Sequence, residues 1–245
     1  MRLLVVNPNT TKSMTEKIGA AARAVAALGT DIVAVNPESG PASIEGYYDE
    51  VFAIPGLIGE MRRAGTVDAT IIACFDDTGL DAARSFSAAP VIGIGEAAFH
   101  LASLVAGKFS VVTTLSRSVP AIEHNLVRYG LISRCAKVRA ADVAVLELEI
   151  PGSAARGRIS REIDRAIHED QAEAIVLGCA GMADLAADLS REHGLPVIDG
   201  VAAAVKLAEA LGGLGLKTSK RHGYASPIEK IYAGTMSGYS PGKQS

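Results

Sequence analysis

Two stretches of this 245-residue chain decide its fold, Ile71–Asp77 (IIACFDD) and Ile175–Gly181 (IVLGCAG). Each starts with an apolar run, which is typical of a strand buried on both faces of a parallel sheet. Each then carries a cysteine into a turn, and Cys74 and Cys179 lie 105 residues apart. If this spacing is the period of an internal repeat, the two thiols occupy equivalent positions.

The same spacing recurs elsewhere in the chain. The segments that match at a spacing of 106 residues are 5–7 (VVN) with 111–113 (VVT), 90–93 (PVIG) with 196–199 (PVID), and the small-residue helical segments 96–102 with 202–208. Agreement at several independent anchors is hard to produce by chance. It predicts two similar halves related by a pseudo-two-fold axis.

Apolar runs alternate with segments of helical periodicity in both halves. Predicted strands cover 2–7, 31–36, 68–73, 90–94, 108–113, 135–139, 174–178 and 196–198. Predicted helices cover 12–28, 49–64 (with a kink or break at Pro55-Gly56), 78–86, 96–106, 118–129, 158–169, 182–193 and 201–211, with a short helical piece near 227–232.

This alternation predicts an α/β fold of two pseudo-symmetric lobes, each a mostly parallel four-stranded sheet flanked by helices. Residues 1–95 plus 200–245 form the first predicted lobe, and residues 96–199 form the second. Ligands of such sheets bind beyond the carboxyl ends of the strands. We therefore expect the active site in the cleft between the lobes, where Cys74 and Cys179 both lie.

Composition narrows the classes of function. The net charge is −3 without a basic stripe, which argues against a nucleic-acid partner. Apolar runs are too short for a membrane span or a signal peptide, so we expect a cytoplasmic protein with no membrane partner. Five histidines without ligand-like spacing predict no metal site. Glycine turns at 178–181 and 93–95 lack the full pattern of a phosphate or dinucleotide loop, so we expect no cofactor.

The three cysteines, an odd number, argue against a disulfide framework. A lone cysteine at a strand end is most often a small buried residue. Cys135 has no counterpart in the repeat and is assigned to that class. The matched positions of Cys74 and Cys179 favour a functional role for both.

Two equivalent thiols across a cleft support one specific chemistry. A thiolate is a base as well as a nucleophile, so one cysteine can remove a proton from a carbon while the other returns one to the opposite face. Each cysteine precedes a predicted helix, whose backbone N–H groups and dipole favour a thiolate. Those N–H groups can also hold an enolate-like oxyanion.

Polar residues at the strand ends leave two interpretations open. Asn9, Thr113 and Thr114 either face a ligand or merely cap the helices that follow. Asp76 and Asp77 are acid–base carboxylates or, as we favour, residues that cap the next helix and tune Cys74.

Several motifs of this chain resemble those of the hydantoin racemases, a branch of the aspartate/glutamate racemase superfamily. The motifs are NPNTT (7–11), PASIEG (41–46), ACFDD (73–77), PVIGI (90–94), SVVTT (110–114), LGCAGM (177–182) and PVIDG (196–200). Those at 41–46 and 73–77 favour the hydantoin branch over the amino-acid racemases.

The resemblance implies cofactor-independent racemisation of 5-monosubstituted hydantoins in a homo-oligomer. One of Cys74 and Cys179 takes the C5 hydrogen, and the other reprotonates the opposite face. The substrate-binding residues that the resemblance implies are Asn9, Ile44, Phe75, Thr113, Thr114, Ala180 and Gly181. Ile44 then contacts the C5 substituent.

Other functions stay open at this point. Allantoin is itself a 5-substituted hydantoin, so an allantoin racemase is the nearest alternative. An aspartate or glutamate racemase is a further one, although the cysteine turns contain no arginine to bind a free carboxylate. A decarboxylase or isomerase of the same superfamily would use one or both thiols. Two alternatives lie outside that class. One is a two-lobed binding protein for small ligands. The other is a thiol–disulfide enzyme, against which the absence of a Cys-x-x-Cys motif argues.

Overall fold

The computed structural model describes residues 1–241 as two four-stranded sheets. Their strand orders are β2-β1-β3-β4 and β6-β5-β7-β8, and the paired strands are parallel throughout. The strands are β1 (Arg2–Val6), β2 (Asp31–Val35), β3 (Ala69–Ile72), β4 (Val91–Gly93), β5 (Phe109–Thr113), β6 (Cys135–Ala140), β7 (Ala174–Gly178) and β8 (Val197–Asp199). The equal strand order of both sheets confirms the predicted α/β fold of two similar halves.

Helices connect the strands in both halves. The α-helices are α1 (Lys12–Val25), α2 (Tyr47–Ala64), α3 (Leu80–Phe86), α4 (Ile94–Val105), α5 (Val119–Arg128), α6 (Ala155–Glu169), α7 (Ala186–His193) and α8 (Gly200–Gly213). The 3-10 helices are η1 (Ser116–Ser118), η2 (Ile132–Arg134), η3 (Val145–Glu149), η4 (Ala180–Leu185), η5 (His222–Tyr224) and η6 (Gly234–Tyr239). Within the described residues, no helix is both long and apolar enough to cross a membrane.

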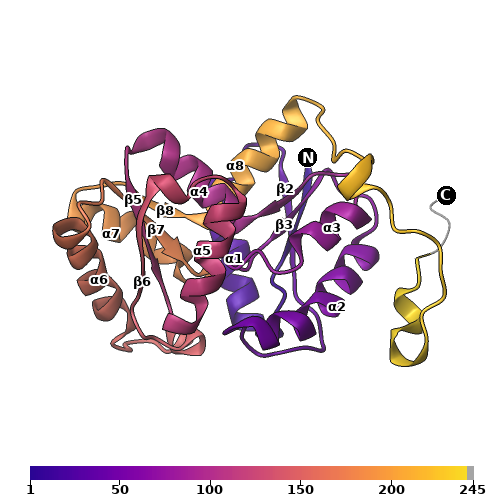
Figure 1. Ribbon diagram of the computed structural model, residues 1–245, viewed down its shortest axis with the longest axis horizontal. Helices are drawn as coiled ribbons and strands as arrows, with labels where there is room; N and C mark the ends of the chain where they lie inside the picture. The colour runs from indigo at the N-terminus through magenta and orange to yellow at the C-terminus, as the bar shows by residue number, and fades with distance from the viewer. Residues whose placement is uncertain (242–245) are drawn as a thin grey trace.

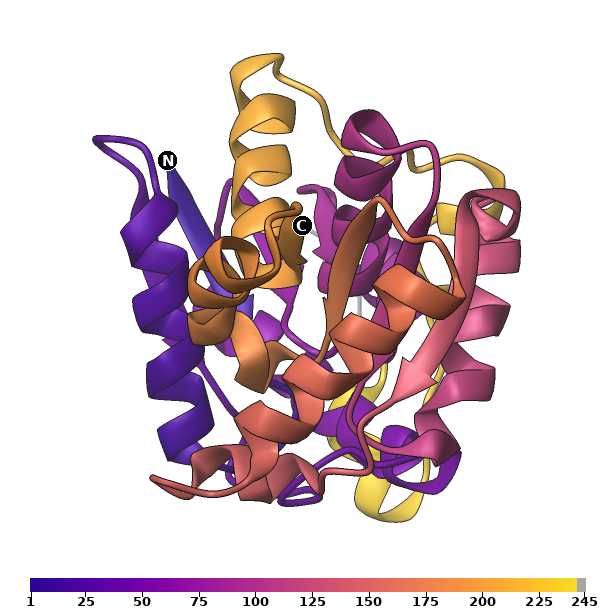
Figure 2. The same cartoon turned by 90° about the vertical axis from the view of Figure 1, so that its left-hand side faces the viewer.

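Figure 1 shows the two sheets as separate lobes, with β5–β8 on the left and β1–β3 on the right. Helices α1, α4 and α8 lie between them. The two lobes exchange helices, because α4 follows β4 but packs on β7, while α8 follows β8 but packs on β3. Seen from the side in Figure 2, α8 stands beside α1 at the junction. The division at residues 95 and 199 stays a prediction, and residues 242–245 of the first predicted lobe lie outside the described range.

The alternation of side chains along each strand sorts the core into layers. Leu3 and Val5 point into the central core between the sheets, whereas Leu4 and Val6 point to the outer face under α2. Val111 and Val112 divide in the same way in the second lobe. Both faces of each sheet are therefore covered by apolar side chains, and the polar residues concentrate at the strand ends.

Two local expectations were wrong, and the break predicted at Pro55-Gly56 is absent. Helix α2 runs unbroken through Pro55, and Gly56 is required because a Cβ there would lie 2.8 Å from the Pro37 ring. The helix predicted over 182–193 begins as the 3-10 helix η4 and becomes α-helical only at Ala186. No helix forms at 227–232, where the chain is exposed and short helices lack a packing partner.

Candidate active site

A small cavity lies at the carboxyl ends of β3 and β7, and both matched cysteines line it. Cys74 follows β3 by two residues, and Cys179 follows β7 directly. Each lobe therefore supplies one thiol to the same cavity. The lining residues are Asn9, Met14, Ile44, Ala73, Cys74, Phe75, Asp76, Thr114, Ser118, Val145, Gly178, Cys179 and Ala180.

Each of the two cysteine sulfurs accepts a hydrogen bond from the backbone N–H two residues further along the chain. The N–H of Asp76, two residues after Cys74, hydrogen-bonds to that sulfur and lowers its pKa, and the N–H of Gly181 does the same for Cys179. The Thr78 hydroxyl donates a further hydrogen bond to Cys74 Sγ over 3.4 Å. Asp76 and Gly181 lie 105 residues apart, so the repeat extends to the amides that face the thiols.

The pKa values of both thiols are raised, although the sequence led us to expect that backbone N–H groups would favour a thiolate. Burial raises the pKa of Cys179 to about 12, and the negative charge of Asp76 adds to the rise. Burial likewise raises the pKa of Cys74 well above its usual value, again with help from Asp76. No helix starts directly behind Cys74, since α3 begins only at Leu80. The loss of solvent around each sulfur raises its pKa more than the backbone amides lower it.

Asp77 caps a helix, but not the one that follows it in sequence. Its carboxylate accepts the N–H groups of Gly95 (2.9 Å) and Glu96 (2.8 Å) at the start of α4, and the Tyr129 hydroxyl (2.7 Å) from α5. Gly93 leaves room for it, because a Cβ there would overlap the carboxylate. Burial raises the pKa of Asp77 to about 7.

In the second lobe, the equivalent helix start is capped by a residue at a different position. Asp199 stands where Gly93 stands in the first lobe, and its own carboxylate accepts the N–H groups of Val201 (3.0 Å) and Ala202 (2.8 Å) at the start of α8. In the first lobe the cap comes instead from the cysteine loop. Asp77 therefore ties the loop of Cys74 to helices α4 and α5.

The structure brings most of the predicted site residues together around the cavity. Asn9, Ile44, Phe75, Thr114 and Ala180 line it. Asn9 is fixed there because its side-chain oxygen accepts hydrogen bonds from the Asn7 amide (2.8 Å) and the Thr11 N–H (2.9 Å). The Phe75 ring packs edge-on against Phe99 of α4, with centroids 5.4 Å apart.

Two predicted residues stand behind the cavity wall. Thr113 donates its hydroxyl hydrogen to the Gly178 carbonyl oxygen over 2.9 Å, which joins the ends of β5 and β7. Gly181 contributes its N–H to the Cys179 sulfur and does not line the cavity.

Six lining residues were not among the predicted catalytic or substrate-binding residues, namely Met14, Ala73, Asp76, Ser118, Val145 and Gly178. Asp76 caps no helix in the described residues, but its charge raises the pKa of Cys74, so the predicted tuning of that thiol is confirmed. Ser118 begins α5 from the other lobe, and nothing in its local sequence marks it. Val145 comes from a segment (141–152) in which the sequence predicts a loop or an edge segment and no site residue.

The loop before α2 (residues 36–46, the cover loop) contributes Ile44 to the cavity wall and is tied to the second lobe. Ile44 lies on this loop and is 8% exposed. Directly after it, the Glu45 carboxylate accepts the Val145 N–H (2.9 Å), and the hydroxyl of Tyr47, the first residue of α2, lies 3.1 Å from His124 Nδ1. Both bonds cross between lobes, and together they hold the end of the loop and the start of α2 against the second lobe.

Cys135 lies in the core, with its pKa raised by burial to about 12. It is remote from the cavity lining. Among residues 1–241, no three His, Cys, Asp or Glu side chains are grouped to hold a metal ion.

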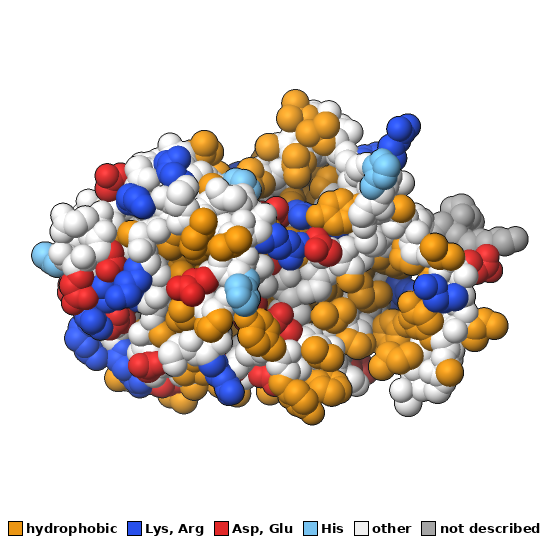
Figure 3. All heavy atoms as spheres, viewed as in Figure 1, with side chains coloured by type: hydrophobic (Ala, Val, Ile, Leu, Met, Phe, Trp, Pro, Cys, Tyr) orange, Lys and Arg blue, Asp and Glu red, His pale blue; other side chains and the backbone are white. Residues whose placement is uncertain are grey.

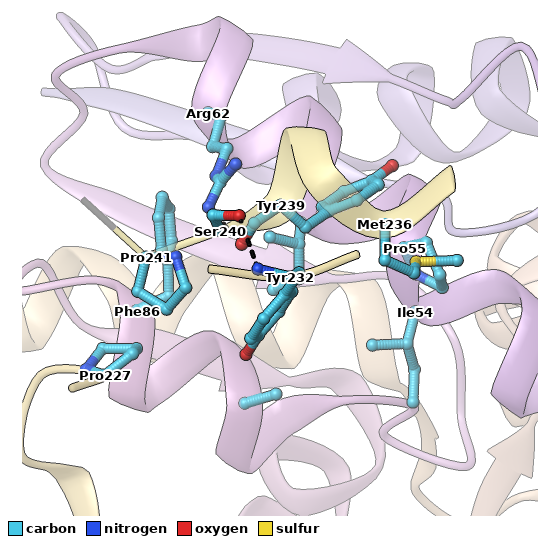
Figure 4. A pocket seen from close by; sticks show the side chains of 12 residues that line it. Ile54, Pro55, Arg62, Phe86, Pro227, Tyr232, Met236, Tyr239, Ser240 and Pro241 are labelled. Carbon is cyan, nitrogen blue, oxygen red and sulfur yellow. Dashed lines mark hydrogen bonds between the residues drawn. The ribbon is translucent and has the colours of Figure 1, made fainter. Parts of the chain in front are cut away.

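A larger hollow lies elsewhere, between α2, α3 and the tail (Figure 4). Its walls are mostly apolar, with Ile54, Phe86 and Tyr232 among them. Arg62 fastens the tail by donating to the Gly238 (2.6 Å) and Tyr239 (3.1 Å) carbonyl oxygens. This hollow contains no thiol, so we assign it to the packing of the tail.

Comparison with known proteins agrees with the geometry of the thiol cavity. The family model of Asp/Glu/hydantoin racemases matches residues 3–208. The chain belongs to this family. It is 47% identical to a hydantoin racemase of Pseudomonas sp. (strain NS671), over 98% of this chain and 97% of that protein. It is 50% identical to a hydantoin racemase of Rhizobium meliloti, over 96% of this chain and 98% of that protein.

Among solved structures, the chain is similar to an allantoin racemase from Klebsiella pneumoniae. The TM-score is 0.95 and the identity 49%, over 98% of this chain and 99% of that chain. Together with the relatives above, this similarity makes the chain an isomerase of the racemase type. The substrates named for these proteins differ in the C5 substituent of one ring.

Proposed function

We propose that this racemase inverts C5 of 5-monosubstituted hydantoins without a cofactor, by a two-base mechanism. The observation that carries the proposal is the cavity between Cys74 and Cys179, to which each lobe contributes one thiol. One thiolate removes the C5 proton, and the other thiol protonates the opposite face. For the other enantiomer the two cysteines exchange roles.

The chemistry of the ring suits such a site. Its C5 hydrogen lies between a carbonyl group and a ring nitrogen, so its removal gives a flat, enolate-like intermediate. A flat intermediate is open to reprotonation from either face. The amides of Asp76 and Gly181 stabilise whichever sulfur carries the negative charge.

The polar atoms of the ring require hydrogen-bonding partners. The hydroxyls of Thr114 and Ser118 line the cavity, and within the described residues neither makes a hydrogen bond to protein. Both are thus available to the ring carbonyl and N–H groups. The anchored Asn9 amide lies on the same wall, and Phe75 offers an apolar face. Thr113 and Gly181 act indirectly, by holding Gly178 and Cys179.

The C5 substituent faces the cover loop. Ile44 and Val145 present an apolar surface on this side, which favours alkyl and aryl groups. Allantoin is the second candidate substrate, because the similar Klebsiella pneumoniae structure is named an allantoin racemase. Its ureido group carries N–H donors, for which the Asp76 carboxylate on the cavity wall is an acceptor.

A chiral assay tests the proposal. Separate enantiomers of 5-benzylhydantoin, allantoin, aspartate and glutamate are incubated with the enzyme, and chiral chromatography follows their inversion against enzyme-free blanks. We expect inversion of at least one hydantoin and no inversion of either amino acid. Inversion of aspartate or glutamate alone would replace the proposed substrate class. Binding of a hydantoin without turnover would indicate a binding protein.

We also propose that the chain acts as a homo-oligomer in the cytoplasm. Apolar side chains gather where the tail crosses the first lobe (Figure 3), and Ile228 and Ile231 are 78% and 94% exposed. Exposure of such side chains is typical of an interface with another chain. Sedimentation of the purified protein tests the assembly.

A further inference from the structure

Asp76 is a largely buried residue whose carboxylate has no hydrogen-bond partner among residues 1–241. The residue is 9% exposed. The neighbouring Asp77, in contrast, accepts three hydrogen bonds. Buried carboxylates are normally paired or fully hydrogen-bonded. Asp76 lines the same cavity as Cys74 and Cys179, and its charge acts on both sulfurs.

Only one lobe carries this group. The residue equivalent to Asp76 in the second lobe is Gly181, which keeps the amide toward the sulfur but has no side chain. The charge of Asp76 nevertheless acts on both sulfurs, because it raises the pKa of Cys74 and of Cys179. A single carboxylate therefore acts on both thiols of a cavity whose cysteines and amides are otherwise matched between the lobes.

The surroundings of Asp76 favour proton uptake. Glu50 of α2 and Asp77 of the same loop are the charged groups that act on it, and both are acidic. Glu50 Oε1 is itself buried without a hydrogen-bond partner in the described part of the chain. Burial, followed by these two charges, raises the pKa of Asp76 to about 7. Neutral pH thus leaves Asp76 able both to accept and to give up a proton.

We propose that Asp76 exchanges a proton with the catalytic thiols, taking it from the cysteine that is about to act as base and returning it at the end of turnover. This inference rests on the proposed two-cysteine racemisation. It explains how thiols buried in a desolvated cavity become bases, since the charge only moves from a carboxylate to a sulfur and none is added to the cavity.

The protons balance over one cycle. The Asp76 carboxylate takes the proton of one thiol, which leaves a thiolate and a neutral carboxylic acid. The thiolate removes the C5 proton, and the bonding pair of that C–H bond becomes the enolate-like anion. The opposite thiol then protonates C5 and becomes the thiolate. Asp76 finally returns its proton to that sulfur, and the cavity holds one negative charge at every stage.

The test is the pH profile of Asp76→Asn, measured with both enantiomers of a hydantoin that the wild type racemises. For the wild type we expect kcat/KM to fall below a pH of about 7 and to be level above it. For Asp76→Asn we expect a loss of roughly 100-fold or more at pH 7.5. The level region should be replaced by a rate that rises about tenfold per pH unit, as hydroxide in place of Asp76 forms the thiolate.

Two further variants separate proton exchange from a structural role. Asp76→Glu retains a carboxyl group and should restore part of the level region. Glu50→Gln removes an acidic neighbour, which lowers the pKa of Asp76 and should move the acid limb to lower pH. Wild-type activity at pH 7.5 in Asp76→Asn, or a faster rate there, would overturn the inference, because Asp76 would then only suppress the thiolates. A wild type that racemises no hydantoin would instead overturn the proposed function.

Discussion

The capping role of Asp77 leads to a quantitative prediction about stability. In Asp77→Ala, the N–H groups of Gly95 and Glu96 lose their acceptor, and so does the Tyr129 hydroxyl. Loss of a helix cap costs about 1–2 kcal/mol, and an unsatisfied buried donor costs about 1–3 kcal/mol more. At pH 6 we expect a loss of roughly 3 kcal/mol in the free energy of unfolding, which lowers Tm by roughly 6–12 °C for a chain of this length.

Thermal unfolding followed by circular dichroism measures this loss, and Asp199→Ala is the matched control. Asp199 caps α8 through two N–H groups and accepts no hydroxyl, so its removal should lower Tm by about half as much. Burial raises the pKa of Asp77 from 3.8 to about 7. Its contribution is therefore present at low pH and lost as the pH rises through about 7. The difference between wild type and Asp77→Ala should be larger at pH 6 than at pH 8.

The reasoning would be refuted by equal losses in Asp77→Ala and Asp199→Ala, or by a Tm for Asp77→Ala within about 2 °C of the wild type. Tyr129→Phe isolates the third hydrogen bond. It should account for the excess of the Asp77→Ala loss over the control loss, roughly 1–2 kcal/mol.

Three other predictions concern stability, the third thiol and the cover loop. Asp76→Asn should raise Tm at pH 8, because an unpaired buried charge is removed, and the gain should shrink as the pH falls through about 7; a lower Tm at pH 8 would contradict this. Cys135→Ala should leave kcat/KM near the wild-type value, and a large loss would give the third thiol a role in the reaction. Glu45→Ala releases the cover loop from Val145 and should raise KM more than it lowers kcat, whereas an unchanged KM would mean that this bond does not hold the cover closed.

The strands and their equivalence were predictable from sequence, because they rest on local patterns. Apolar runs at a fixed spacing revealed β3 and β7, and the repeat placed Cys74 and Cys179 at the same end of matched strands. Both features depend on hydrophobic periodicity alone. No knowledge of the tertiary packing was needed to infer them.

The finer organisation of the site could not be predicted, because it depends on contacts between distant segments. Asp77 reaches a helix start 18 residues further along and a tyrosine on α5, and no local rule distinguishes this from a cap of the next helix. The rise in the thiol pKa reflects atoms from both lobes around the sulfur, whereas sequence shows only the nearest amides. Residues 227–232 likewise form no helix and are exposed, which their local helical pattern does not show.

The two-cysteine mechanism is tested most directly by exchange of the C5 hydrogen in deuterated water, using Cys74→Ala and Cys179→Ala. Proton NMR follows loss of the C5 signal for each separate enantiomer, and chiral chromatography follows inversion, both against enzyme-free blanks. We predict that neither variant racemises, that each exchanges the C5 hydrogen of one enantiomer only, and that the two variants act on opposite enantiomers. Racemisation at the wild-type rate in either variant, or exchange of the same enantiomer by both, would contradict the assignment of one thiol to each face.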